Sequence, residues 1–234
     1  MTAHHGGELE TLDGDALVAS LERRFRTVIV DVPVDDRTYS ILKPANADDL
    51  IREEDFVKDE RLPYWADIWP SSTILAARLQ KMDRRGAKAL ELGCGVGLCT
   101  IAARRAGLDV LSTDYYEDAL EFTRANVFRN SAGDARTMLF DWRHPPDNLG
   151  RFDFIFASDV LYEREYAILL PQILDKALAD RGSALVADPG RVAVPVFLEV
   201  CAEIGLIASK EETRPFASGE IRQSIDIYSV TRGN

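Results

Sequence analysis

The spacing of apolar side chains divides the chain into a short first region and a longer, more regular one. Residues 13 to 25 have the spacing of an amphipathic helix with Asp13 or Asp15 as its cap. Residues 26 to 44 contain two alternating runs around a VDD turn, which predict a β-hairpin. Residues 47 to 62 are highly charged and are expected to be helical or irregular. We therefore expect residues 1 to 62 to form an N-terminal appendage made of a helix and a hairpin.

From residue 63 onward the apolar pattern switches repeatedly between helical and strand periods. Pro171 lies within one predicted helix, where it either restarts or kinks that helix. The predicted helices cover residues 71–82, 97–106 and 116–130, a stretch ending at 179, and 195–205. The predicted strands cover residues 87–92, 108–114, 137–142, 152–159, 182–190, about 206–215 and about 221–231.

This order of elements predicts one domain over residues 63 to 234. Strand–helix alternation requires crossover connections, which favour a mostly parallel sheet with helices on both faces. The last two strands follow each other directly and should pair antiparallel. The predicted fold is therefore α/β, with a seven-stranded, mostly parallel sheet and an antiparallel C-terminal strand.

Composition and charge narrow the possible partners. The chain has 234 residues with 28 basic and 39 acidic side chains, a net charge of −11. Such an acidic surface argues against a nucleic-acid partner. No signal-peptide pattern and no membrane-length apolar run are visible, so we expect no membrane partner and a cytoplasmic location. Cys94, Cys99 and Cys201 form no disulfide framework or metal-binding pattern, and we interpret them as core-lining thiols.

The segment KALELGCGVGLCTIAA, residues 88 to 103, places a glycine turn between a predicted strand and a predicted helix. Gly93, Gly95 and Gly97 lack a Cβ, so the backbone can approach a ligand closely and adopt positive φ. The spacing does not fit the dinucleotide pattern G-x-G-x-x-G, and the Gly-Lys-Ser/Thr of a P-loop is missing. The turn therefore predicts a binding site for a different nucleoside-containing cofactor.

Two further strand ends carry side chains suited to a nucleoside. Asp114 follows Gly93 by 21 residues, and its carboxylate can accept hydrogen bonds from ribose hydroxyls; a helix cap is the alternative role. Asp141 can accept from an adenine amino group, and Trp142 offers a flat apolar face to the ring.

These motifs together resemble a class I methyltransferase that uses S-adenosylmethionine, which has a Rossmann-like fold. The stretch FDFIFASDVLY is similar to the Asp/Glu-x-x-Tyr/Phe motif of the seven-β-strand protein-lysine methyltransferases, also called methyltransferase family 16. DIWPSSTILAARL resembles the segment that opens the domain in that group. ADPGR is similar to the fifth-strand end of the electron transfer flavoprotein β-subunit lysine methyltransferases. The likeness covers about residues 63 to 231.

The resemblance implies S-adenosyl-L-methionine as the cofactor and methylation of a lysine on a protein substrate. It implies that Asp159 and Tyr162 face the acceptor nitrogen as the catalytic pair, with Asp159 positioning the amine; a helix cap is the alternative role of Asp159. No metal is implied. The implied cofactor contacts are Trp69, Gly93, Cys94, Gly95, Asp114, Trp142 and Ser158.

Two departures from the family pattern concern the expected substrate mouth. Arg143 stands where many relatives have glycine, and Trp65 with Tyr64 adds aromatic rings before Trp69. A base methyltransferase is disfavoured because SDVLY lacks the prolines of Asn/Asp-Pro-Pro-Tyr. A small-molecule amine N-methyltransferase and a catalytically silent cofactor-binding module remain alternatives.

Overall fold

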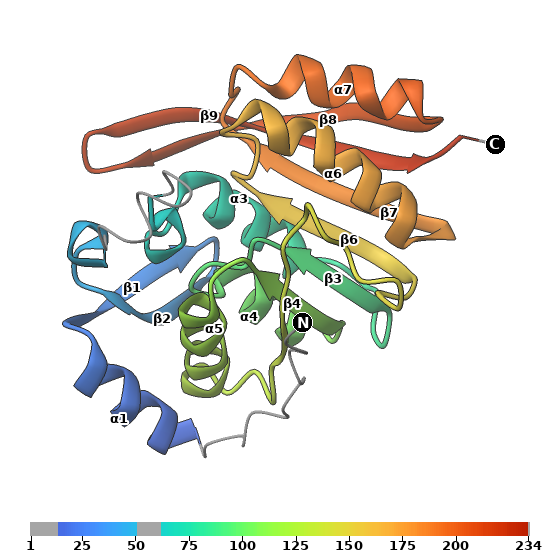
Figure 1. Cartoon of the computed structure of the whole chain (residues 1–234). Coiled ribbons are helices and arrows are strands. Elements are labelled where there is room, and N and C mark those ends of the chain that lie inside the picture. Colours follow the sequence, from blue (N-terminus) through green and yellow to red (C-terminus); the bar gives the residue numbers. More distant parts are fainter. Residues whose placement is uncertain (1–13, 51–61, 234) are drawn as a thin grey trace.

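The computed structural model describes residues 14–50 and 62–233 (Figure 1). Of the two aspartates expected to cap the first helix, Asp13 lies outside the described residues, and Asp15 lies within the first turn of that helix and not before it. Most of the charged stretch 47–62 also lies outside the described residues. Ala47–Leu50, which begins that stretch, forms the short 3-10 helix η1. Among the described residues, no helix is long and apolar enough to cross a membrane.

The first region contains the predicted helix and hairpin. Helix α1 spans Gly14–Arg24, and its buried residues are Leu17 and Leu21. Strands β1 (Thr27–Val34) and β2 (Arg37–Pro44) pair antiparallel as a separate two-stranded sheet. Their turn includes Asp35 at a φ of 52°.

The central sheet has seven strands, as predicted. Four parallel pairings join β5, β4, β3, β6 and β7, and β9 then runs antiparallel to both β7 and β8. The order along the sheet is β5-β4-β3-β6-β7-β9-β8. The bounds are β3 Lys88–Leu92, β4 Asp109–Asp114, β5 Arg136–Leu139, β6 Phe152–Ser158, β7 Leu178–Asp188, β8 Leu206–Ser218 and β9 Ile221–Arg232.

Helices cover both faces of this sheet (Figure 1). Alternate residues of a strand point to opposite faces, and the buried side chains accordingly divide into two apolar clusters. One cluster includes residues of α3, α4 and α5, and the other includes residues of α6 and α7. Their bounds are α3 Pro70–Leu79, α4 Leu98–Arg105, α5 Glu117–Arg129, α6 Arg164–Ala177 and α7 Val194–Glu203; η2, Tyr64–Ala66, precedes α3.

Pro171 lies inside α6, which continues through it, so it does not restart the helix. A proline has no N–H to donate to the preceding turn, so one intrahelical hydrogen bond is absent there. Residue 178, expected at the end of this helix, instead begins β7, which starts earlier than the predicted residue 182. Helix and strand therefore follow each other without a loop.

Side-chain amides in α5 and at its C-cap join the hairpin to the site-forming part of the fold, and the most buried of them is Asn126. The Asn126 side chain on α5 accepts a hydrogen bond from the Leu42 N–H at 2.7 Å and donates to the Leu42 carbonyl at 2.8 Å. The same nitrogen donates to the carbonyl of Val96, in the glycine turn, at 2.9 Å. Asn126 is fully buried, so losing these partners would leave polar groups unsatisfied. Through Asn126, the hairpin therefore stabilises the position of the glycine turn.

Candidate active site

The glycine turn follows β3 and leads into α4. Gly93, Gly95 and Gly97 have φ angles of 73°, 53° and 87°, a region that side chains with a Cβ rarely adopt. A Cβ on Gly95 would lie 3.0 Å from the carbonyl oxygen of Trp65, and one on Gly97 would lie 2.9 Å from Thr123 Oγ1. The sequence pattern is therefore explained by backbone conformation and by close packing below the turn.

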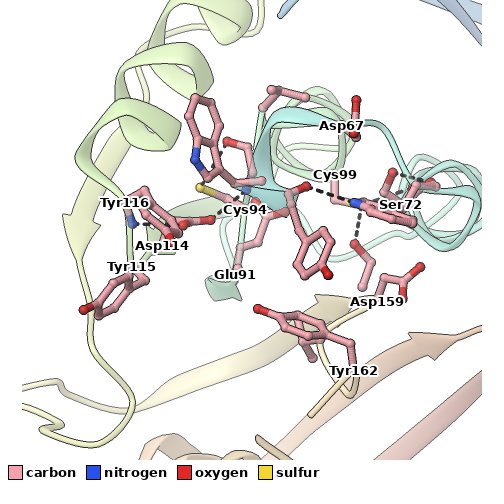
Figure 2. Close-up of a pocket in the computed structure, with 18 of the residues that line it drawn as sticks. Asp67, Ser72, Glu91, Cys94, Cys99, Asp114, Tyr115, Tyr116, Asp159 and Tyr162 are labelled. Atoms are coloured by element: carbon pink, nitrogen blue, oxygen red, sulfur yellow. Dashed lines mark hydrogen bonds between the residues drawn. The ribbon is translucent and has the colours of Figure 1, made fainter. Parts of the chain in front are cut away.

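A cavity opens above this turn at the carboxyl ends of the parallel strands (Figure 2). Sheets of this kind bind ligands at that edge, where the direction of winding reverses on either side of β3. All nine residues that the sequence analysis assigned to the site line this one cavity: Trp69, Gly93, Cys94, Gly95, Asp114, Trp142, Ser158, Asp159 and Tyr162.

Asp114 ends β4 and is held by the backbone of neighbouring turns. Its Oδ2 accepts from the N–H of Gly95 at 2.9 Å, and its Oδ1 accepts from the N–H of Tyr116 at 3.1 Å. The residue is only 6% exposed. Burial raises the pKa of Asp114, and the backbone N–H groups oppose that rise. Tyr116, not Asp114, occupies the N-cap position of α5, where no side-chain cap bond forms.

Glu91 lies on β3, the strand next to β4, and its carboxyl group is buried at the base of the cavity. It accepts a hydrogen bond from the Thr100 hydroxyl, which also lies 2.8 Å from the hydroxyl of Ser112. Within the part of the chain that the structure describes, the hydrogen-bond partners of its carboxyl group are the hydroxyls of Thr100 and Ser112, and neither is a cation. Burial raises the pKa of Glu91 to about 8, so the group is protonated at neutral pH.

Asp159 follows β6 on the other side of β3, and it is held by side chains instead. Its Oδ1 accepts from Arg191 Nη2 at 2.7 Å and Arg191 Nε at 2.8 Å, and its Oδ2 accepts from the Ser71 hydroxyl at 3.2 Å. Asp159 has a φ of 57° and is 7% exposed. Helix α6 begins only after Glu163, so Asp159 is not its cap.

Aromatic rings form a continuous wall along the cavity. Tyr162 packs edge-on against Tyr64, with ring centroids 5.3 Å apart, and against Tyr166 at 5.1 Å. Tyr64 also contacts Trp69 at 6.0 Å, and Tyr166 contacts Trp142 at 5.6 Å. Tyr162 is 38% exposed, so its ring is accessible from outside. Such faces favour flat rings and alkylammonium groups.

The structure corrects the expectation for Arg143 and adds contacts for Asp141 and Trp65. Arg143 does not line the cavity; it binds Asp141, with its Nε 2.9 Å from Oδ1 and its Nη2 3.0 Å from Oδ2. Burial raises the pKa of Asp141, but the stronger combined effect of Arg143 and His144 lowers it to about 2. Asp141 lines the cavity while it is paired with this guanidinium, and its contact with an adenine amino group stays a prediction. Trp65 lines the cavity, as expected of a residue near the site, and it is also buried against Phe122 and Tyr116 in the core.

Sequence reasoning missed the partners of Asp159. Arg191 was noted only as the last letter of ADPGR, although an arginine just after a strand that neighbours an acidic strand end is a usable signal. The sequence did not indicate a role for Ser71, because a serine is a common residue at the start of a helix. Cys94 and Cys99 are buried free thiols, and burial raises the pKa of both. Within residues 14–50 and 62–233, no cluster of His, Cys, Asp and Glu has a metal-binding arrangement.

The fold defines the class of the protein. The magnesium protoporphyrin IX methyltransferase from Synechocystis PCC 6803, solved with bound SAH, matches with a TM-score of 0.54 at 18% identity. The match covers 70% of this chain and 81% of that chain. A putative transferase from Pyrococcus horikoshii matches 88% of this chain and 72% of its own, with a TM-score of 0.56 at 14% identity. The fold is that of the Rossmann-like methyltransferases.

The sequence then gives the family. The lysine methyltransferase family profile matches residues 53–194, and the chain belongs to this family. Protein-lysine N-methyltransferase rrg1 of Schizosaccharomyces pombe is 35% identical over 139 residues, which are 53% of this chain and 46% of that protein. The electron transfer flavoprotein beta subunit lysine methyltransferase of Xenopus laevis is 33% identical over 138 residues, 55% of this chain and 53% of that protein. The chain spans about half the length of these curated relatives.

Proposed function

We propose that this protein is an S-adenosylmethionine-dependent N-methyltransferase that methylates a lysine side chain of a protein. Family membership supports the reaction class. The observation that carries the proposal is the single cavity that brings Asp114 and the glycine turn together with Asp159 and Tyr162. The proposed nucleoside site and the proposed amine site would thereby share one cavity, as group transfer requires.

The residues at the Asp114 end fit the adenosine part of the cofactor. A carboxylate has about four lone-pair positions, and the backbone N–H groups of Gly95, Tyr115 and Tyr116 hydrogen-bond to Asp114. The capacity that these N–H groups leave on the two oxygens would accept hydrogen bonds from the ribose hydroxyls. Trp142 and Phe140 line the same cavity and offer apolar faces to the adenine ring. When bound, S-adenosylmethionine would supply a methyl group already activated on a positively charged sulfur.

The roles of the remaining contacts follow from their positions. The backbone of Gly93, Cys94 and Gly95 would pass beneath the methionine part of the cofactor. Trp69 and Ser158 would flank the transferable methyl group from the two sides of the cavity. These residues would exclude water and hold the two reactants in line, which is most of what such a transfer needs from a protein.

Asp159 and Tyr162 would face the acceptor nitrogen. An amine reacts only through its free lone pair, so the site must align a neutral amine rather than bind an ammonium tightly. The Asp159 carboxylate would accept a hydrogen bond from the amine, and the Tyr162 ring would pack on the alkyl chain and on the charge that develops at nitrogen. The family favours a protein lysine over a free amine as the acceptor.

Transfer of label tests this proposal. The purified protein and S-adenosylmethionine carrying a tritiated methyl group are incubated with a cell lysate, and protein and small-molecule fractions are counted separately. We expect label in a discrete protein band, which mass spectrometry of a digest then assigns to methylated lysine. Label only in small molecules would support the small-amine alternative. No transfer despite cofactor binding would support a silent binding module.

A matched pair of variants shows whether the label comes from this cavity. Asp159→Asn should lose most of the transfer, whereas Asp147→Asn changes the same chemical group at a fully exposed position and should keep it. Equal labelling by both variants would contradict the assignment of the acceptor site.

A further inference from the structure

The ion pair between Arg191 and Asp159 is a largely buried interaction rather than a surface contact. Two nitrogens of one guanidinium, Nε and Nη2, approach the same carboxylate oxygen at 2.8 and 2.7 Å. The Asp159 side chain is 3% exposed, so solvent screens the pair weakly on that side. A third donor, the Ser71 hydroxyl, occupies the other oxygen. The carboxylate is therefore neutralised before any substrate arrives.

The loop after β7 fixes Arg191 in this position. The backbone N–H groups of Gly190 and Arg191 donate to Asp188 Oδ1 at 2.7 and 2.6 Å, which closes a tight turn at the end of the strand. The Arg191 guanidinium also lies over the Trp69 ring, 5.6 Å from its centroid. Backbone, ring and carboxylate together hold the guanidinium, so it is not a freely rotating surface cation.

Asp159 and Trp69 both line the cavity, whereas Arg191 is not among the described residues that line it. We therefore expect an acceptor amine inside the cavity to reach Asp159 without displacing Arg191. Arg191 is therefore expected to stay paired with Asp159 when the substrate binds.

We propose that Arg191 is a positioning residue that neutralises Asp159, so that the site hydrogen-bonds the acceptor as a neutral amine instead of trapping it as an ammonium. This inference rests on the proposed function. A lone carboxylate stabilises a neighbouring ammonium and opposes its deprotonation. With Arg191 in place, the Asp159 oxygen still accepts a hydrogen bond, but the pair carries no net charge. Asp159 can thereby still position the amine by a hydrogen bond, and it no longer opposes loss of the proton that the amine must give up before it reacts.

Several other charged and titratable groups surround Asp159. Asp188 lies behind it on β7, and burial raises the pKa of Asp188. Tyr162 and Glu163 follow on its own loop. From the rest of the cavity wall, the groups that face the same space are Asp67, Glu91, Cys94, Cys99, Asp114, Tyr64, Tyr115, Tyr116, Asp141 and Tyr166. None of these is a cation, so Arg191 is the neighbour that offsets the negative charge of Asp159.

The first test uses n-butylammonium, which copies the end of a lysine side chain and needs no known protein substrate. Its affinity for the protein saturated with S-adenosylhomocysteine is measured by calorimetry. Arg191→Gln should bind n-butylammonium about tenfold more tightly than the parent, because the unpaired carboxylate now attracts the cation. Arg191→Lys keeps the charge and should resemble the parent. Asp159→Asn combined with Arg191→Gln should lose the gain.

Unchanged or weaker binding by folded Arg191→Gln would overturn the inference. Circular dichroism and S-adenosylhomocysteine affinity establish that each variant is folded, with Arg181→Gln, an exposed arginine near the opposite end of β7, as the matched control. If Arg191→Gln does not fold, the comparison between Arg191→Lys and the double variant decides. The double variant removes both charges, and it should bind n-butylammonium no more tightly than Arg191→Lys does.

The second test is the pH profile of methyl transfer to the labelled protein band. In Arg191→Gln the midpoint of the rise in rate should move upward by about one pH unit, which is a loss of about tenfold at pH values below it. The double variant should return the midpoint toward that of the parent. A purely structural role would lower the rate at every pH without moving the midpoint. Absence of transfer by the parent would refute the proposed function, while the n-butylammonium result would still decide the role of Arg191.

Discussion

Asp114 and Asp159 stand at the carboxyl ends of β4 and β6, on either side of the strand that carries the glycine turn. The two aspartates are almost equally buried, at 6% and 7% exposure. Asp114 receives only backbone N–H groups, whereas Asp159 is paired with a guanidinium. Figure 2 shows them at opposite sides of the cavity.

The difference matches the partners that each end is proposed to bind. Backbone N–H groups orient a carboxylate but leave its charge and some lone pairs available, which suits neutral hydroxyls of a ribose. A guanidinium cancels the charge, which suits an amine that must stay unprotonated. One type of residue at two equivalent strand ends therefore has two different electrostatic roles, set by its neighbours.

Glu91 lies between them on β3. Among the residues that the structure describes, its carboxyl group is bound neither by backbone N–H groups, as in Asp114, nor by a guanidinium, as in Asp159. Its pKa of about 8 exceeds that of an unfolded glutamate, so the folded state binds an extra proton between about pH 4.5 and pH 8. Stability should therefore fall as pH rises through that window, by up to about 1.4 kcal/mol per pH unit. Glu91→Gln should remove most of this slope, as measured by urea unfolding from pH 5 to 8.

This is the largest effect we expect among the three carboxyl groups. The Asp147→Asn variant, changed at a fully exposed aspartate, should retain the parental slope. If the slope of Glu91→Gln equals that of the parent, Glu91 is ionised in the folded protein and the contrast with its two neighbours disappears.

Asp114→Ala should weaken binding of S-adenosylhomocysteine by about 1–3 kcal/mol, because two charge-assisted hydrogen bonds to the ribose are lost. Calorimetry measures the affinity directly, and Asp147→Ala serves as the matched control. Parental affinity in Asp114→Ala would reduce the role of this aspartate to bracing the glycine turn through Gly95.

Asp159→Asn should separate the two ends of the cavity. Cofactor affinity should stay close to that of the parent, while single-turnover methyl transfer should fall by about tenfold or more, since about 1.4 kcal/mol of transition-state stabilisation is a factor of ten. The measurement uses the acceptor protein identified by labelling. A parental transfer rate would mean that the amine site lies elsewhere.

Tyr162→Phe should have the smallest effect, because the ring face against Tyr64 and Tyr166 is retained. Loss of the Tyr162 hydroxyl, with its hydrogen bond to Tyr166, is expected to cost about 0.5 kcal/mol, or about twofold in transfer rate. The same single-turnover assay checks it. A loss as large as that of Asp159→Asn would assign the hydroxyl, rather than the ring, to the acceptor.

Most of the fold was predictable from local pattern. The strand at residues 87 to 92 and the final antiparallel pair are confirmed as β3 and as β8 with β9. These succeed because apolar periodicity and glycine positions are local properties of the chain. The junction at residue 178 was not predictable, since a helix that passes directly into a strand has no turn residue to mark it. The division at residues 62 and 63, like the cytoplasmic location, stays a prediction.

What the sequence by itself determined was that the residues at the ends of several strands reach one cavity. Strand ends of a parallel sheet meet at one edge, so motifs at those ends converge there whatever the details of packing. The charge state of each carboxyl group was decided only by the tertiary structure. Arg191 lies 32 residues from Asp159 along the chain, and the hydroxyls around Glu91 come from a helix and a neighbouring strand. Burial and pairing depend on contacts between distant segments, and a local sequence pattern does not specify those contacts.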